Sequence, residues 1–308
     1  MISPFLNFIQ KSNLTYLVKL FLLILFELSY TTIKKLFRKR RIVFKKIKNK
    51  KLVVLTGGSK GIGENILKIL IESNFEVIVL SRTKPKLPVE HIHTDLSDFG
   101  SIKSAVKQIG DRKINIIINN AGVFYMSKEK DSEDMNLLVN YFGHYFLITS
   151  LLENFNKDTL IIFTSSSFSF LAKNFITKES TFFNKGYNYC ASKVCINLLV
   201  RIIKRNYKLK CVAVHPGLIL TNIINSKIIN RVFNILNKFL WFVFDSKEQA
   251  AANVVLSINN NNLSNKPGKC DFIWKNKIIN LNSFYNEENE EELENYTKEF
   301  LKNKKIKI

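Results

Sequence analysis

The chain has 308 residues, of which 46% are hydrophobic and 23% charged, and it contains 11 Gly and 5 Pro. This composition excludes a disordered or collagen-like chain, and the length is sufficient for one large domain with a sizeable core. Four cysteines with no C-x-x-C spacing exclude a disulfide scaffold and fit a reducing, cytosol-facing environment.

The net charge of +22 is concentrated at the N-terminus. The first 51 residues contain 13 Lys and Arg against one acid, Glu27, a net charge of +12, and the other 257 residues carry the remaining +10. A surface that binds nucleic acid needs basic charge clustered on one face of a domain. We therefore expect no nucleic-acid partner.

The N-terminal segment is first apolar and then strongly basic. Residues 14–30 are mostly apolar, and 5–33 are long enough to span a membrane if Lys19 reaches toward an interface. A soluble amphipathic helix is the alternative. Residues 31–51 contain no acid, which is typical of a cytoplasmic flank and of binding to anionic lipid. We expect residues 1–50 to anchor the protein in the endoplasmic reticulum or a similar membrane, with the rest in the cytosol.

From residue 51 onward, short apolar runs alternate with helical patterns. Strands are expected at 52–55, 75–80, 89–93, 115–118, 159–164, 211–214 and 271–274. Helices are expected at 64–73, 97–109, 133–153 and 187–206, and the acidic run 287–294 is expected to open the last helix. This alternation predicts one α/β domain over 51–308, a doubly wound parallel sheet of about seven strands with helices on both faces.

A glycine-rich segment, TGGSKGIG at 56–63, follows the first strand and opens the first helix. Gly57 and Gly61 permit a tight turn and close backbone approach, Gly63 lets helix and strand pack, and the helix N-terminus then faces a pyrophosphate. After the second strand stands Arg82 rather than the acid that binds the ribose of NAD, and Lys60 lies in the glycine segment. Two cations can bracket a 2′-phosphate, so NADP is favoured over NAD.

Tyr189 and Lys193 are four residues apart and share one face of a predicted helix. A nearby ammonium stabilises tyrosinate and lowers the pKa of the phenol, which suits general acid/base chemistry. The fifth strand ends in a run of serines that offers a hydroxyl to a carbonyl oxygen, and Asn140 is a polar residue in an apolar helix. His91 and His93 lack further ligands, so no metal site is expected.

Seven segments in order, TGGSKGIG, DL (95–96), NNAG (119–122), the helix of Asn140, SS (165–166), YCASK (189–193) and HPGLILT (215–221), resemble the short-chain dehydrogenase/reductase superfamily. The segment VNYFGHYFLIT (139–149), the 22-residue gap between Ser166 and Tyr189, and the YCASK and HPG segments are similar to its retinol-dehydrogenase-like branch, which includes membrane-anchored enzymes. The resemblance implies a Rossmann-type fold and a catalytic set in which Tyr189 moves the proton of the substrate oxygen, Lys193 assists it, Ser166 orients that oxygen and Asn140 holds a water. Ser165 and Ser167 adjoin Ser166 and are the alternatives for its role.

The cofactor-binding residues implied by the glycine segment and the resemblance are Gly57, Ser59, Lys60, Gly61, Ile62, Gly63, Arg82, Asp95, Leu96, Asn119, Ala121, Gly122, Tyr189, Lys193, Pro216, Gly217 and Thr221. The resemblance also implies a substrate lid near 222–245, although a plain core helix fits the apolar stretch within it equally well. We therefore expect an NADP-dependent oxidoreductase that interconverts a hydrophobic alcohol with its aldehyde or ketone, and a homodimer is possible. The alternative is a nucleotide-binding scaffold or redox sensor at a membrane surface.

Overall fold

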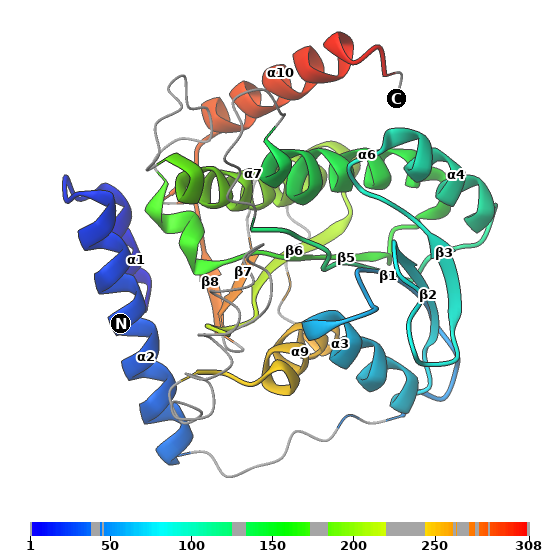
Figure 1. The fold of residues 1–308 in the computed structure, drawn as a ribbon, viewed down its shortest axis with the longest axis horizontal. Helices are drawn as coiled ribbons and strands as arrows, with labels where there is room; N and C mark the ends of the chain where they lie inside the picture. Colours follow the sequence, from blue (N-terminus) through cyan, green and yellow to red (C-terminus); the bar gives the residue numbers. More distant parts are fainter. Residues whose placement is uncertain are drawn as a thin grey trace.

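The architecture is that of a computed structural model of the full chain (Figure 1). The structure describes residues 2–37, 44, 46–124, 134–172, 184–219, 244–260, 263, 271–274, 277–282 and 284–306. The expected cofactor residue Thr221 and nearly all of the expected lid at 222–245 lie outside these residues.

A single eight-stranded sheet forms the centre of the molecule, in the order β3-β2-β1-β4-β5-β6-β7-β8. The first seven strands are parallel, and β8 pairs antiparallel with β7. The strands are β1 Leu52–Thr56, β2 Glu76–Ser81, β3 Glu90–His93, β4 Ile116–Asn119, β5 Leu160–Thr164, β6 Lys210–His215, β7 Asp271–Trp274 and β8 Lys277–Asn280. The direction of strand order reverses between β1 and β4, and ligands of doubly wound sheets bind beside such a reversal, at the carboxyl ends of the strands.

Helices cover both faces of the sheet, as the sequence predicts (Figure 1). One face carries α4 Phe99–Ile109, α6 Gly143–Ser150 and α7 Asn184–Tyr207, and the other carries α3 Gly61–Glu72 and α9 Lys247–Val255. Short elements are α5 Met135–Leu137, η1 Leu138–Phe142, η2 Leu152–Asn154, η3 Ser167–Leu171 and η4 Leu256–Asn259. Strands such as β1, LVVLT, are buried along their whole length because both faces are covered.

Several elements differ from the sequence-based expectation, and α9 is one that the sequence did not indicate. The hairpin partner β8 was not predicted, because its four residues are too short to show a periodic pattern. The single helix expected at 133–153 is divided into α5, the π-helical turn η1, α6 and η2. π-helical turns inside helices occur frequently at functional sites, and η1 contains Asn140.

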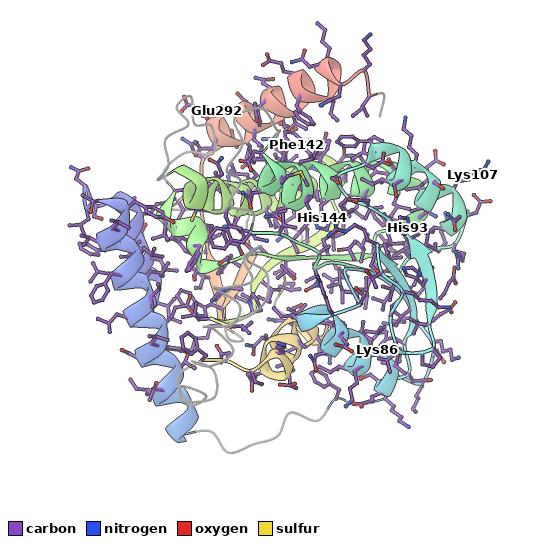
Figure 2. The ribbon with its side chains drawn as sticks, viewed as in Figure 1. Lys86, His93, Lys107, Phe142, His144 and Glu292 are labelled. Carbon is purple, nitrogen blue, oxygen red and sulfur yellow. The ribbon has the colours of Figure 1, made fainter. Side chains whose placement is uncertain are left out.

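The last helix, α10 Glu287–Asn303, forms an outer layer over α7 and α6 (Figure 1). Its Glu290 is fully buried and accepts hydrogen bonds from Arg201 and, at 2.7 Å, from Arg205, both on α7. Its Phe300 stacks on Phe142 of η1 at 3.6 Å between ring centroids, and Figure 2 shows Phe142 on the side of its helix layer that faces α10. The C-terminal helix is therefore held by a buried ion-pair cluster and by aromatic packing.

The first two helices, α1 Ile2–Lys11 and α2 Tyr16–Phe37, form a hairpin beside the β7–β8 end of the sheet (Figure 1), called the N-terminal hairpin below. The stretch Tyr16–Ile33 is long and apolar enough to cross a membrane by length and composition. One side of α2 is buried at every fourth residue, Lys19, Leu23, Glu27 and Thr31. The opposite side exposes large apolar side chains, Leu17, Phe21, Leu25 and Ile33.

Candidate active site

The glycine segment forms the turn between β1 and α3 at the carboxyl edge of the sheet. Gly61 has a φ of +65° and open space where a Cβ would lie, and a Cβ on Gly63 would stand 1.9 Å from the carbonyl oxygen of Gly57. The first turn of α3 begins after Lys60, whose side chain makes no capping hydrogen bond. Ser59 and Ile62 lie in the same turn, half-buried. A cradle of bare backbone before an uncapped helix N-terminus fits the pyrophosphate of a dinucleotide.

Two side chains tie this turn to the segment after β4. The Thr56 hydroxyl accepts hydrogen bonds from the amides of Asn120 and Ala121, each at 3.0 Å. The Asn120 side chain donates through Nδ2 to the carbonyl oxygens of Thr56 and Gly57 at 3.2 and 3.3 Å. Asn120 was not singled out from the sequence, although it lies inside the NNAG segment. Its side chain links the turn after β1 to the segment after β4.

Charged side chains lie at the ends of β1, β2 and β3. Lys60 and Arg82 are exposed and follow β1 and β2, which pair in register from Leu52 with Glu76 to Thr56 with Leu80. Asp95, after β3, lies 3.8 Å from the Arg82 guanidinium. Burial acts to raise the pKa of Asp95, but hydrogen bonds from Ser97 and the charges of Arg82 and His93 outweigh it and lower the pKa. The predicted cations thus share one edge of the sheet.

Further predicted cofactor residues that the structure describes lie at the same edge. Asn119 is buried at the end of β4. His144 of α6 contacts Asn119 Oδ1 through Nδ1 at 3.0 Å and the carbonyl oxygen of Ala121 through Nε2 at 2.9 Å. Figure 2 shows His144 on the sheet side of this helix layer. Burial lowers the pKa of His144 to about 4, so the ring is neutral. Leu96 is buried after β3, and Pro216 and Gly217 are buried after β6.

Tyr189 and Lys193 share one face of α7, with the Lys193 Nζ 5.6 Å from the phenol ring centroid. Nζ donates to the carbonyl oxygen of Thr164 at 2.9 Å, and burial lowers the pKa of Lys193 to about 8. Burial and the neighbouring Cys190 raise the pKa of Tyr189, while a hydrogen bond with Ser166 lowers it. The pKa of Tyr189 therefore moves opposite to the direction expected from the lysine alone, and burial is the largest cause.

The three adjacent serines have different surroundings. The Ser165 hydroxyl donates to Asn197 Oδ1 at 2.8 Å, and the Ser167 hydroxyl donates to Glu27. Both side chains are buried. Ser166 is half-buried and hydrogen-bonded to Tyr189, whereas the hydroxyls of its two neighbours bond to other partners.

Asn140 is buried in η1, and its side chain joins two parts of the site. Its Oδ1 accepts from the Val123 amide at 2.8 Å, and its Nδ2 donates to the Val123 carbonyl at 2.9 Å and to the Ser192 hydroxyl at 3.1 Å. Three of its four hydrogen-bonding positions are thus used within the protein. The water-holding role implied by the resemblance rests on the one position that remains on Oδ1, next to Gly122, where a Cβ would lie 3.2 Å away.

Two aromatic side chains beside Tyr189 were missed by the sequence analysis. Phe124 stacks on Tyr189 at 4.5 Å between centroids, and Phe168 meets the same ring edge-on at 6.4 Å. Both are half-buried. The sequence placed each near a site motif but offered no signal that it would face the phenol. Together they give the Tyr189 phenol an apolar environment.

The glycine turn lies where the strand order reverses, a position at which doubly wound sheets bind dinucleotides. A tyrosine, a lysine and a serine are grouped at the same edge of the sheet. This combination is typical of a nicotinamide-dependent oxidoreductase. The family model described as short chain dehydrogenase matches residues 51–231, and the chain belongs to this family. Within it, the chain falls in the retinol-dehydrogenase-like branch.

Curated relatives support this placement. The chain is 28% identical over 219 residues to human retinol dehydrogenase 11, with 63% of this chain and 67% of that protein covered. It is 30% identical over 220 residues to retinol dehydrogenase 12 of Bos taurus, with the same coverage. It is 23% identical over 231 residues to human polyprenol dehydrogenase, covering 65% and 70% of the two chains.

Solved structures share the fold. A short chain dehydrogenase family protein from Francisella tularensis matches with a TM-score of 0.57 at 20% identity, covering 73% of this chain and 97% of that one. A short-chain dehydrogenase/reductase from Burkholderia multivorans with bound NADP matches with a TM-score of 0.56 at 16% identity, covering 75% and 99%.

Proposed function

We propose that the protein is a membrane-associated, NADP-dependent oxidoreductase that interconverts a hydrophobic alcohol with its aldehyde or ketone. The observation that carries this proposal is the grouping of Tyr189, Ser166 and Lys193 at the cofactor edge, with Phe124 and Phe168 against the phenol. Relatives named retinol dehydrogenase and polyprenol dehydrogenase support an apolar substrate for this chain.

The residues of the cradle fit a nicotinamide dinucleotide, which when bound would supply or accept the hydride. Tyr189 donates its hydroxyl proton to the carbonyl oxygen in the reductive direction and takes it back in the oxidative direction. Ser166 orients that oxygen through its hydroxyl. Lys193, with a pKa lowered to about 8 by burial, stabilises the phenolate that is left behind.

The choice of NADP rests on two exposed cations at one edge. Lys60 and Arg82 follow neighbouring parallel strands and can bracket a 2′-phosphate, and no acid follows β2 at Arg82 to bind the free ribose hydroxyl of NAD. A Lys60→Ala, Arg82→Ala double variant is expected to raise the KM for NADPH by at least about 10-fold, on loss of two charge-assisted contacts, and to leave the KM for NADH within about 3-fold. An equal effect on both cofactors would contradict the choice.

The N-terminal hairpin is proposed to lie along the membrane surface with the catalytic domain in the cytosol. Its buried side contacts the domain, and Leu17, Phe21 and Leu25 expose apolar surface on the opposite side. A helix with one side on protein and one apolar side exposed suits the interface, whereas a span would be surrounded by lipid. Phe21→Asp together with Leu25→Asp is expected to release the protein from anionic vesicles, with Ser29→Asp as the matched exposed control.

Turnover by the full chain in membranes tests the proposal. We would offer NADPH or NADH with retinal, a polyprenal, steroid ketones and short aldehydes, beside a Tyr189→Phe variant. Activity with NADPH on a long apolar carbonyl, lost in the variant, is expected. Tight NADPH binding without turnover on any carbonyl would favour a redox sensor or scaffold instead, and no binding of either cofactor would refute the reading of the glycine cradle.

A further inference from the structure

A buried carboxylate from the N-terminal hairpin reaches the two loops that border the catalytic site. Glu27 of α2 is 1% exposed. Its Oε1 accepts a hydrogen bond from the Ser167 hydroxyl, and its Oε2 lies 3.0 Å from His215 Nε2. These partners are 140 and 188 residues away in the chain.

The hydrogen bonds around His215 fix the direction of each proton. The Ser167 amide donates to His215 Nδ1 at 3.2 Å, so Nδ1 carries no proton and the neutral ring is protonated on Nε2. Nε2–H then donates to Glu27 Oε2, while the Ser167 hydroxyl donates to Oε1. The carboxylate, the imidazole and Ser167 therefore form a closed ring of hydrogen bonds in which each donor has an acceptor.

The ring stands next to residues placed in the site. Ser167 follows Ser166, the residue hydrogen-bonded to Tyr189, and His215 precedes Pro216 at the end of β6. The hairpin makes a second polar contact close by, where the Tyr16 hydroxyl lies 3.6 Å from Cys190 Sγ, directly after Tyr189. Phe26, beside Glu27, packs edge-on against Trp274, which also packs against His215.

We propose that Glu27 is a positioning residue of the active site. Through it, the N-terminal hairpin fixes the loop of Ser166 and the loop of Pro216 relative to each other. The proposal rests on the proposed oxidoreductase function. It makes the hairpin part of the catalytic unit as well as the membrane-binding element. A buried carboxylate is costly unless its partners are in place, so docking of the hairpin and assembly of the two loops occur together.

Three variants of the full chain in membranes or detergent test this inference. Glu27→Leu removes both acceptors and is expected to lower kcat by about 10- to 100-fold, the usual effect of a small misplacement of reacting groups. Glu27→Gln keeps one acceptor for His215 and offers a donor to the Ser167 hydroxyl, so kcat is expected within about 5-fold of wild type. Leu23→Ala, one turn away on the same buried stripe, is the matched control for loosened packing without loss of the ring.

Hydrogen exchange supplies a readout independent of turnover. Peptides covering 165–172 and 210–217 are expected to exchange faster in Glu27→Leu than in Leu23→Ala, while peptides of β1 and β4 stay unchanged in both. The inference would be overturned if Glu27→Leu and Leu23→Ala had the same kcat and the same exchange rates in these peptides. It would also be overturned if both kcat and the exchange rates of Glu27→Gln matched those of Glu27→Leu rather than those of wild type. If the wild type turns over no carbonyl, the proposed function fails, yet the exchange comparison still decides whether Glu27 holds the two loops.

Discussion

Asn140 offers the sharpest test of how the site is held together. Replacing it with alanine removes three hydrogen bonds and leaves the amide and carbonyl of Val123 without their partner. An unpaired buried polar group costs about 1–3 kcal/mol, and because Val123 is half-buried we take the lower end for each of its two groups. With the lost contact to Ser192, the expected decrease in the free energy of unfolding is about 3 kcal/mol.

Urea unfolding followed by tryptophan fluorescence measures this decrease, since Trp274 is fully buried. The matched control is Ser192→Ala, which removes one of the three bonds of Asn140 and the bond from Ser192 to the Tyr189 carbonyl, and is expected to cost about 1–2 kcal/mol. Asn140→Ala should also lower kcat by about 10- to 100-fold, because the turn after β4 and helix α7 lose their link. Equal unfolding free energies for the two variants would refute the reasoning.

Three further predictions follow from the described contacts. Gly63→Ala would place a Cβ 1.9 Å from a backbone oxygen of the glycine turn and is expected to abolish NADPH binding, measured by cofactor fluorescence. Burial lowers the pKa of Lys193 from 10.5 to about 8, so between these values the unfolded chain binds a proton that the folded chain does not. The free energy of unfolding of wild type, relative to that of Lys193→Met, is therefore expected to rise by about 2 kcal/mol from pH 8 to pH 10. Urea unfolding at both pH values measures this rise. Glu290→Ala leaves buried Arg201 without its carboxylate and is expected to cost about 3–5 kcal/mol in the same assay.

Each of these has a result that contradicts it. NADPH binding by Gly63→Ala within about 3-fold of wild type would mean that the turn can relax around a methyl group. A stability difference between wild type and Lys193→Met that stays flat over the same pH range would mean that the lysine is solvated. The exposed pair of Asp158 and Lys210, 3.3 Å apart, is the control for Glu290. Asp158→Ala is expected to lower the free energy of unfolding by less than about 1 kcal/mol. An equal decrease for Asp158→Ala and Glu290→Ala would contradict the larger stabilisation expected from the buried ion-pair cluster.

The central sheet and the placement of its site were accessible from the sequence because both depend on local patterns. The strands β1, β4, β5 and β6 are short apolar runs, and the glycine turn and the Tyr189–Lys193 pair are read within a few residues. A strand end also identifies an edge of the sheet, which placed Lys60 and Arg82 together. Such reasoning needs only the neighbours of a residue along the chain.

What the sequence did not reveal depends on packing between distant segments. In the sequence, Glu27 is only a charged residue that interrupts an apolar helix. Its contact with His215, 188 residues later, is formed by the tertiary fold and has no local signal. The sign of the pKa shift of Tyr189 follows from burial in the folded chain, which no spacing in the sequence shows. The π-helical turn at Asn140 and the short strand β8 likewise have no periodic signature of their own.

The separation between Glu27 and His215 also bears on how the protein is made. Synthesis at about 5–20 residues per second leaves the hairpin without this partner for about 10–40 s after Glu27 is added to the chain. During that interval the apolar side of α2 and the side that will later pack on the domain are both available to a bilayer or a chaperone. Membrane attachment can therefore precede folding of the catalytic domain, and the arrival of β6 would then draw an already attached helix onto the site it completes.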